Sequence, residues 1–437
     1  MIALENKILQ RINLHKSGKS VGITSVCSAN HYVIKAAILN AKKNNQILLI
    51  EATSNQVDQF GGYTGLTPAQ FKQSVLELAK QLNFSEENII LGGDHLGPNR
   101  WQNESSAAAM HKAEDQISAY VSAGFTKIHL DASMKCADDG NRNFPLDPSI
   151  IAERCATLCK ASEEALTQSG HNDLPVYIIG TDVPPPGGGK EHHNIRITRP
   201  EEVEETISLT ERAFKKYNLN EAWERVIGVV VQPGVEFGDS EVFDYDRNKC
   251  KPLVKLIENY PILVYEAHST DYQKKELLRQ MVEDHFVFVK VGPWLTYAFR
   301  EAVFALALIE MEILSNKKGI LLSNLIDIVD QRMLEFPKYW ENYYTASEEE
   351  NKLKRKFSYS DRIRYYWSDK KVEESLQRLI KNLNENKIPI TLIRQYLPEE
   401  YNAISEGMIS ANPEEIILHK ISSVLEIYNY ATSGGVN

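Results

Sequence analysis

The chain has 437 residues, of which 43% are hydrophobic and 25% are charged, and its formal net charge is −10 at pH 7. This is the composition of an ordinary globular protein, long enough for one large domain with an appendage or for two domains. The acidic balance, with no long basic run, argues against a dedicated nucleic-acid binder. The first residues lack a signal-peptide pattern, and no apolar run approaches the roughly 18 residues of a membrane span.

Short runs rich in β-branched residues alternate with longer amphipathic segments along the first 300 or so residues. Near-continuous apolar runs are typical of strands buried on both faces, as in parallel sheets. The intervening segments, such as 67–83 and 107–124, have helical periodicity, and the second ends at Gly124, a residue suited to a helix C-terminus. In chain order, the predicted strands cover residues 21–29, 47–55, 89–97, 127–134, 176–184, 227–238, 262–270 and 287–296.

Eight strand–helix units of this kind predict a closed (β/α)8 barrel, the TIM barrel. The competing architecture is a doubly wound open sheet. That architecture usually carries a Gly-rich dinucleotide-binding turn after its first strand. The sequence CSANH, which occupies this place, is not such a turn. We therefore expect a TIM-barrel domain over residues 1–315.

Beyond about residue 320 the alternation stops and only helical patterns follow. They predict a helical C-terminal extension, residues 316–437, packed on the barrel. Two aromatic stretches, 338–344 and 361–369, are expected to form the contact between extension and barrel rather than a ligand surface. The charged run 348–356 is expected to be a solvated loop. The helical segments cover residues 321–336, 371–386 and 413–434.

The five cysteines are scattered along the chain. Cys155 and Cys159 are four residues apart on an expected helix, but no second pair completes a zinc site. Reduced thiols and a cytoplasmic location are therefore expected.

Polar side chains gather at the carboxyl ends of seven of the eight predicted strands, the edge at which (β/α)8 barrels carry their active sites. One carboxylate there could merely cap the following helix. Seven strands contributing together indicate a ligand-binding mouth. The residues are Glu51, Thr53, Ser54 and Asn55; Asp94 and His95; His129, Asp131 and Ser133; Thr181 and Asp182; Gln232 and Glu236; Glu266, His268, Ser269 and Thr270; and Lys290 with Gly292.

His95 and His268 are candidate ligands of a divalent metal, and Glu266 shares the inward face of its strand with His268 by two-residue alternation. Imidazole plus carboxylate suits zinc or a similar ion, which can polarise a sugar carbonyl. Asp94 and Asp131 are then the candidate catalytic acids or bases. In the alternative interpretation, both histidines are hydrogen-bonded scaffold residues.

Further residues at the mouth are candidates for substrate binding. Lys290 and the glycine turn beside it suggest an anion site, because phosphate often binds at this end of a barrel. Residues 181–195, rich in Pro and Gly, are expected to form an irregular loop in which His192 and His193 are simply exposed. The other substrate-binding candidates are Glu51, Asn55, Asp182, Gln232 and Ser269.

Long motifs make the sequence recognisable: SVCSAN, LIEATSNQVDQFGGYTGLTP, IILGGDHLGPN, AGFTKIHLDASM, VVQPGVEF, VYEAHSTDYQ, VKVGPWLT and SDRIRYYW. Together they closely resemble the tagatose-1,6-bisphosphate aldolase subunit family usually called GatZ/KbaZ. The resemblance extends along nearly the whole chain, including the helical extension. One departure is Asp182, which stands where the family pattern Gly-Thr-Glu-Val-Pro has glutamate and puts a direct role of that residue in doubt.

The resemblance implies a (β/α)8 barrel related in architecture to class II, zinc-dependent aldolases. It implies a non-catalytic subunit that the catalytic class II aldolase subunit needs for full activity and stability in galactitol and N-acetylgalactosamine catabolism. Older descriptions of such proteins as tagatose-6-phosphate kinases find no support, because the GxxxxGK[ST] phosphate loop is missing from the sequence. Some relatives have been assigned ketohexose 4-epimerase activity.

Two function hypotheses follow. The first is the aldolase-supporting subunit. The second is a metal-dependent ketose or ketose-phosphate 4-epimerase, interconverting tagatose and fructose through a divalent ion, expected to be zinc. The polar mouth favours the second and the family description favours the first, which we place ahead. The expected ligand is a ketose or ketose phosphate, and the sequence leaves a homo-oligomer open.

Overall fold

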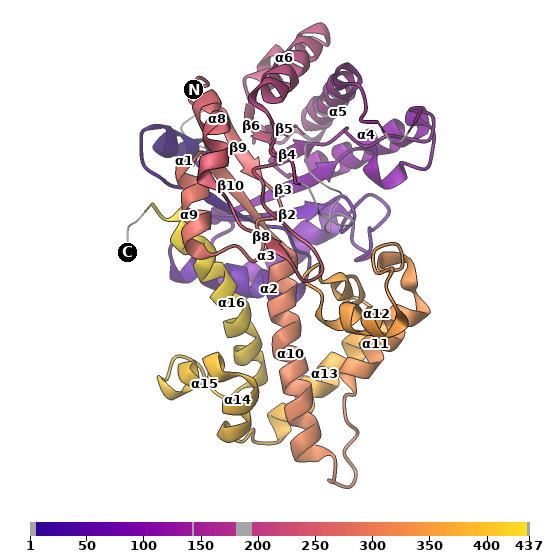
Figure 1. Cartoon of the computed structure of the whole chain (residues 1–437), viewed down its shortest axis with the longest axis vertical. Helices are drawn as coiled ribbons and strands as arrows, with labels where there is room; N and C mark the ends of the chain where they lie inside the picture. The colour runs from indigo at the N-terminus through magenta and orange to yellow at the C-terminus, as the bar shows by residue number, and fades with distance from the viewer. Residues whose placement is uncertain (1–5, 142–143, 181–194, 435–437) are drawn as a thin grey trace.

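Parallel strands close into a barrel at the centre of the molecule (Figure 1). The computed structural model describes residues 6–141, 144–180 and 195–434. Within these ranges the strands follow the barrel order β1-β10-β9-β6-β5-β4-β3-β2, and so the predicted (β/α)8 fold is confirmed. The barrel strands are β1 Ile23–Val26, β2 Leu48–Thr53, β3 Ile89–Leu96, β4 Lys127–Leu130, β5 Val176–Ile179, β6 Val226–Val230, β9 Val264–Ala267 and β10 Phe286–Val291.

A helix follows each barrel strand. In Figure 1 these helices surround the strands. Most begin at a residue that satisfies free backbone N–H groups; Thr67, for example, forms a capping box with Gln70. The helices are α2 His31–Lys43, α3 Pro68–Gln81, α4 Ser106–Ser122, α5 Pro148–Ser169, α6 Pro200–Lys216, α8 Arg247–Ile257, α9 Lys275–Glu283 and α10 Pro293–Leu314.

The segment predicted as one strand over 227–238 is divided in the structure. The barrel strand β6 ends at Val230, and an antiparallel hairpin follows, formed by β7 Glu236–Phe237 and β8 Val242–Phe243. Gly234, at φ +86° next to a proline, turns the chain between them. The predicted continuous strand is therefore wrong beyond Val230. A short helix, α7 Asn220–Trp223, also precedes β6.

The amino ends of the strands are closed by the helix α1, Lys7–Lys16. Its Ile8 and Ile12 are each 1% exposed and pack with the inward-facing apolar residues of the barrel. The floor of the barrel is therefore apolar. Its other members are Ile23, Leu49, Val176, Ile178, Ile227, Val230, Val264, Val287 and Phe288.

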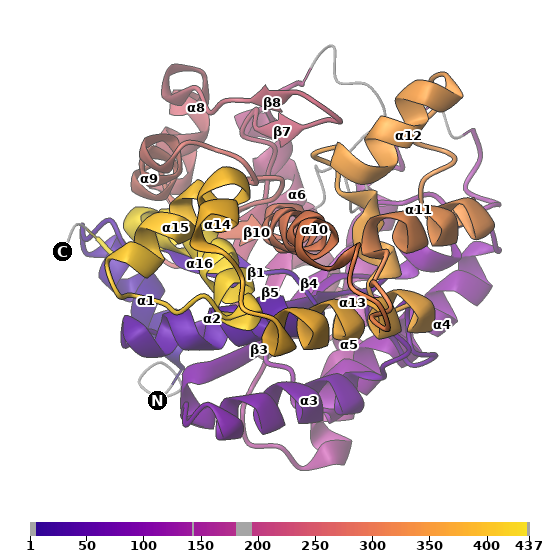
Figure 2. The ribbon, with the colours of Figure 1, turned by 90° about the horizontal axis from the view of Figure 1, so that it is seen from below.

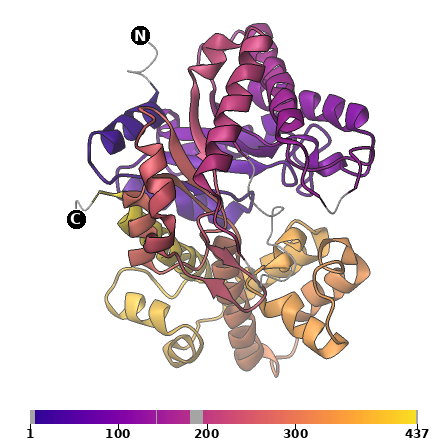
Figure 3. The ribbon, with the colours of Figure 1, turned by 45° about the horizontal axis from the view of Figure 1, so that its top comes forward.

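The helix α10 leaves the barrel and runs into the C-terminal extension. Figure 2 shows it end-on between α11–α13 on one side and α14–α16 on the other, and Figure 3 shows the extension below the barrel. The last helix, α16, packs on α10, α2 and α9, so the extension lies against the barrel as predicted. Its bounds are α11 Leu325–Glu335, α12 Glu348–Phe357, η5 Arg362–Tyr366, α13 Lys370–Glu385, α14 Ile390–Tyr396, α15 Pro398–Ser405 and α16 Pro413–Thr432.

The charged run 348–356, predicted to be a loop, is the helix α12, so that prediction is wrong. Ser347 and Glu350 form a capping box at its start, its first turn is acidic and its last turn is basic. These features favour a helix through its end groups and dipole. Arg355 is buried and pairs with Asp330 at 2.7 Å, which fixes α12 to α11.

The aromatic stretches of the extension contact the barrel, as predicted, but Arg364 and Tyr365 of the second stretch also line the pocket at the mouth, which was not expected. The rings of Tyr365 and Tyr63 have centroids 4.8 Å apart in an edge-on arrangement. The rings of Trp367 and Phe299 are 5.0 Å apart. Tyr339 completes the contact by stacking on Tyr365. The contact between the extension and the rest of the chain is thus made largely by aromatic surfaces, which bury much area per side chain.

No described helix is both long and apolar enough to cross a membrane. The five cysteines are free thiols, four of them buried.

Candidate functional site

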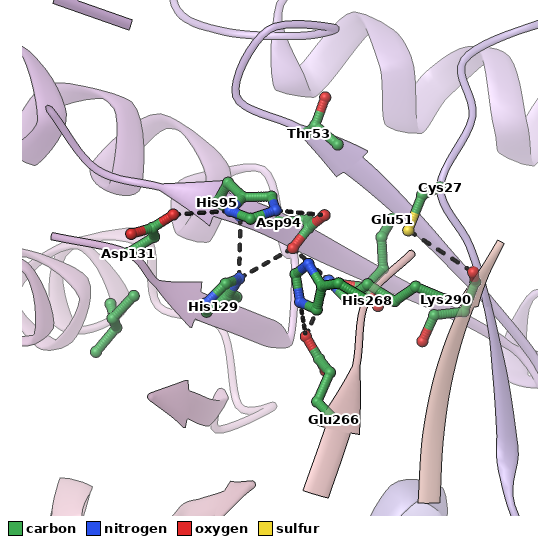
Figure 4. Close-up of polar contacts among 12 residues, drawn as sticks. Cys27, Glu51, Thr53, Asp94, His95, His129, Asp131, Glu266, His268 and Lys290 are labelled. Carbon is green, nitrogen blue, oxygen red and sulfur yellow. Dashed lines mark hydrogen bonds and ion pairs between the residues drawn. The ribbon is translucent and has the colours of Figure 1, made fainter. Parts of the chain in front are cut away.

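The strand β3 turns two successive side chains toward the mouth of the barrel. Neighbouring residues of a regular strand point to opposite faces. Here the pairing with β4 shifts register between Gly93 and Leu96, and His95 lies at φ +50°. This irregularity places both Asp94 and His95 on the wall of one pocket (Figure 4). The bulge explains why an apolar strand ends in two ionisable residues.

The glycines around this bulge allow the backbone of this segment to approach Glu51 and Asp131 closely. A Cβ on Gly92 would lie 2.9 Å from Cγ of Glu51. A Cβ on Gly97 would overlap the carbonyl oxygen of Asp131. The glycine-rich motif therefore allows β3 to pack against charged and polar parts of its two neighbouring strands.

His95 is supported by a carboxylate. Its Nδ1 donates a hydrogen bond of 2.7 Å to Asp131, which also accepts one from the Ser133 hydroxyl. Burial opposes charge on both partners. Even so, the carboxylates of Asp94 and Asp131 raise the pKa of His95, and the hydrogen bond from His95 helps to lower the pKa of Asp131 to about 2. The Nε2 atom of His95 lies 3.9 Å from Oδ2 of Asp94.

His129, on β4, has both ring nitrogens engaged. Its Nε2 donates to the Gly180 carbonyl at 3.1 Å, and its Nδ1 accepts the backbone N–H of His95 at 3.2 Å. Nδ1 also lies 3.0 Å from Oδ1 of Asp94, within hydrogen-bonding distance.

His268 joins these two imidazoles at the mouth. The centroid of its ring lies 4.7 Å from that of His95 and 5.3 Å from that of His129. Its Nε2 is 3.1 Å from Oε1 of Glu266. Burial, aided by the charge of Lys290, lowers the pKa of His268 to about 3. The ring is therefore neutral at physiological pH, as a metal ligand must be.

Beneath the histidines, charges of alternating sign fill the barrel interior. The Lys127 ammonium lies 2.9 Å from Glu51 and 2.6 Å from Glu266. The Lys290 ammonium lies 2.9 Å from Glu266, 3.4 Å from Glu51, and in direct contact with Asp94. Burial favours neutral carboxyls. The two lysines nevertheless hold the pKa of Glu266 well below its usual range, and Lys290 does the same for Asp94.

The chemistry of this donor set fits a divalent metal. One ligand atom from each of Asp94, His129, Glu266 and His268 lies within 4.8 Å of the others. Two of these residues, Glu266 and His268, were expected from the sequence. The third expected ligand, His95, is not among these four residues, although the centroid of its ring lies 4.7 Å from that of His268 and its Nε2 lies 3.9 Å from Oδ2 of Asp94.

The pocket above these groups has about 670 Å³ of space, part of it open to solvent. Its described lining includes residues from both barrel and extension: Cys27, Thr53, Asn55, Gln56, Tyr63, Asp94, His95, Phe237, His268, Ser269, Asp271, Lys290, Gly292, Pro293, Arg364 and Tyr365.

Some of the residues expected to bind substrate line the pocket, and others do not. Asn55, Ser269 and Lys290 line the pocket. Glu51 does not, because it is fully buried beneath Lys127 and Lys290. Gln232 does not either, because its side chain accepts the N–H of Gly234 at 2.8 Å and supports the turn into the β7–β8 hairpin. Neither residue contacts a ligand from these positions.

Two further expectations concern Asp131 and the loop after β5. Asp131 lies behind His95 rather than on the pocket wall, so it acts on a ligand only through that histidine. Asp182, His192 and His193 lie outside the described residues.

Several residues of the site escaped the sequence interpretation. Lys127 was missed because a lysine at the start of an apolar strand looks solvent-exposed, although it is buried. Tyr63, Arg364 and Tyr365 were missed because they lie on a loop and on the extension. The motif SDRIRYYW was the available signal, since it combines an arginine with aromatic residues suited to ligand contact.

Imidazoles and carboxylates surround a pocket at the carboxyl ends of the strands and define a (β/α)8-barrel protein with a polar mouth. The chain belongs to the family described as D-tagatose-1,6-bisphosphate aldolase subunit GatZ/KbaZ-like, which it matches over residues 8–433. It is 41% identical to a probable tagatose 6 phosphate kinase from Sinorhizobium meliloti 1021. That match has a TM-score of 0.85 and covers 94% of this chain and all of the other.

Two more distant solved structures share less with the chain. The YdjI aldolase from Escherichia coli K12 is 11% identical with a TM-score of 0.42, over 87% of this chain and 97% of the other. The fructuronate-tagaturonate epimerase UxaE from Cohnella laeviribosi is 13% identical with a TM-score of 0.46, over 96% and 82%. Likenesses at this level carry no information about the activity of this chain.

Proposed function

We propose that the chain supports a catalytic class II D-tagatose-1,6-bisphosphate aldolase subunit, raising its activity and stability, in cytoplasmic galactitol or N-acetylgalactosamine catabolism. The observation that carries this proposal is the family match along nearly the whole chain, barrel and extension together. A partner that binds only the folded state of the catalytic subunit stabilises it by mass action.

Co-expression of the two chains tests this role. The catalytic subunit should be recovered in higher yield and should withstand higher temperature when this chain is present. His95→Ala, which alters the pocket and leaves the outer surface intact, should preserve the effect. If the effect disappears with His95→Ala, the mouth of the barrel is the working part and the supporting role as proposed fails.

We propose as the second candidate a metal-dependent ketose or ketose-phosphate 4-epimerase acting on tagatose or fructose. The observation that favours it is a pocket lined by Asp94, His95 and His268 above buried Glu266. A subunit with only a supporting surface has no evident need for such an arrangement. Zinc or a similar divalent ion, held by His95, Glu266 and His268, would supply Lewis-acid polarisation of a sugar carbonyl.

The chain's own residues have distinct roles in this second candidate. Asp94, held ionised by Lys290, is the base on the pocket wall that accepts or returns a proton, either in retro-aldol cleavage and re-addition or in direct proton transfer. Asp131 is a positioning residue that orients His95. Asn55 and Ser269 are placed to bind sugar hydroxyls.

Metal content and turnover test the second candidate. Protein purified without added zinc should contain about one divalent ion per chain, and incubation with tagatose, fructose or their phosphates should interconvert them. His268→Ala and His95→Ala should lose the ion, whereas Asp94→Asn should retain it and lose turnover. Equal metal content in wild type and His95→Ala would remove this candidate.

A further inference from the structure

One wall of the pocket is supplied by the extension. Arg364, on η5, lines both the pocket and an adjoining cavity of about 610 Å³ between the barrel and α13. Its guanidinium is held by its own segment. Nη1 donates to the carbonyls of Ser360 at 2.5 Å and Asp361 at 3.1 Å, and Nη2 donates to the Tyr365 hydroxyl at 2.9 Å. The charge is thus fixed in place at the junction of the two spaces.

Within the described part of the chain, the Arg364 guanidinium has no carboxylate within 4.0 Å, whereas two buried arginines, Arg300 and Arg355, each have one. Arg300 pairs with Asp361 at 3.2 Å, and Arg355 pairs with Asp330 at 2.7 Å. A half-buried guanidinium held on neutral acceptors costs free energy that an anionic ligand would offset.

The other cationic features of the pocket are already engaged by carboxylates. The Lys290 ammonium contacts Asp94 and Glu266. The N-terminus of α10, which follows the last barrel strand, is occupied as well. The N–H groups of Gly292 and Trp294 donate to Oδ1 of Asp271 at 3.0 and 2.8 Å. Phosphate often binds at the loops after the last two strands of such barrels. Because Lys290 and the N-terminus of α10 are already engaged by carboxylates here, an anionic ligand needs another cationic partner.

We propose that Arg364 binds the anionic group, phosphate or carboxylate, of a keto-sugar whose carbonyl end lies at Asp94, His95 and His268. The inference rests on the sugar-binding pocket of the second proposed function and names its ligand class. It assigns the extension a direct part in specificity. The barrel supplies the reacting end of the site, and η5 supplies the group that distinguishes a charged sugar from a neutral one.

Calorimetric titration of the full-length, zinc-supplemented protein tests this inference with fructose, fructose 6-phosphate and fructuronate. Wild type should bind at least one anionic sugar more tightly than fructose by a factor of about 10 to 100, the range of one charge-assisted hydrogen-bonding group. Comparison of fructose 6-phosphate with fructuronate shows whether phosphate or carboxylate is preferred. Arg364→Gln should remove the preference, lowering the affinity for the anionic sugars by a much larger factor than the affinity for fructose.

Two further variants serve as controls for the effect of the Arg364 charge. Arg364→Lys, which retains the charge, should keep part of the preference. Lys370→Ala, which removes an exposed charge of the same extension, should keep all of it. Equal affinity of wild type for neutral and anionic sugars would overturn the inference, as would an equal loss for all three sugars in a folded Arg364→Gln.

The same variants separate this inference from the proposed functions. Stabilisation of the aldolase subunit by Arg364→Gln should equal that by wild type. If stabilisation is absent from wild type while the sugar preference depends on Arg364, only the supporting role fails. If fructose binds at the mouth but charge has no effect, only the role of Arg364 fails.

Discussion

Toward its mouth the barrel interior buries lysines and carboxylates in contact with one another, whereas at the amino ends of the strands it is closed by Ile8 and Ile12. The two ends also respond oppositely to protons. Burial raises the pKa of Glu236, beside the mouth, to about 7, and burial lowers the pKa of His15, at the floor, to about 4. The floor therefore stabilises the fold, while the mouth keeps charges that a ligand can use.

The largest effect is expected at the mouth. Lys290→Met leaves Asp94 and Glu266 without one of their cations, and breaking such a buried pair costs about 3–5 kcal/mol of unfolding free energy. Because a divalent ion can replace the lost charge, added zinc should restore more stability to this variant than to wild type. Urea unfolding with and without zinc measures both effects. Unchanged stability without zinc would show that Lys290 does not neutralise the network.

At the floor, Ile12→Ala should lower the unfolding free energy by about 3 kcal/mol, through lost burial and the cavity left behind. Zinc should restore no more stability to it than to wild type, since no charge is involved. Asn13→Ala, on the exposed face of α1, is the matched control and should have little effect. A larger stabilisation of Ile12→Ala than of wild type by zinc would contradict the expected difference between the floor and the mouth.

The pH response of the mouth can be tested at Glu236, which is fully buried by area. Its folded pKa of about 7 is above the unfolded value, so its contribution is present at low pH and is lost as pH rises through 7. Glu236→Gln keeps an acceptor for the Phe237 N–H and cannot ionise. It should exceed wild type by about 2–3 kcal/mol at pH 8.5 and match it near pH 4.5. A pH-independent difference would contradict this assignment.

The floor should show a smaller effect of the opposite sign. The folded pKa of His15 is below the unfolded value, so its contribution is present above about pH 6.5 and is lost as pH falls toward 4. His15→Gln can still donate to the Val21 carbonyl and accept from His285. Between pH 7 and pH 4.5 this variant should lose about 2 kcal/mol less than wild type. Equal losses in urea unfolding would place the acid-sensitive group elsewhere.

Most of the fold could be predicted because apolar periodicity is local information. The start of each barrel strand was predicted to within two residues, and errors arose where a local signal was misjudged. The run 348–356 was taken for a loop although Ser347 and Glu350 give a capping signal. The strand predicted to reach residue 238 failed at the turn of Gly234.

Only the part of the site that lies at the carboxyl ends of strands could be predicted from the sequence. Asp94, His95 and His268 do meet at the mouth. The bulge that turns Asp94 and His95 the same way depends on packing against the next strand. The burial of Glu51 depends on Lys127 and Lys290, from distant strands. Arg364 depends on how the extension docks, which no local pattern specifies.

The end of α16 is joined to the first strand of the barrel. The Gly22 N–H donates to the Thr432 carbonyl at 3.0 Å, Val21 forms a bridge with Ser433, and Arg11 also donates to Thr432. Residues near the two ends of the described chain therefore supply hydrogen-bond partners to one another. During synthesis, the first strand emerges long before the end of α16, whose carbonyl group accepts the Gly22 N–H. The barrel therefore cannot reach its final state until residue 432 has left the ribosome. This chain should consequently need protection as a long-lived nascent intermediate, and its slowest folding event should be the late docking of α16.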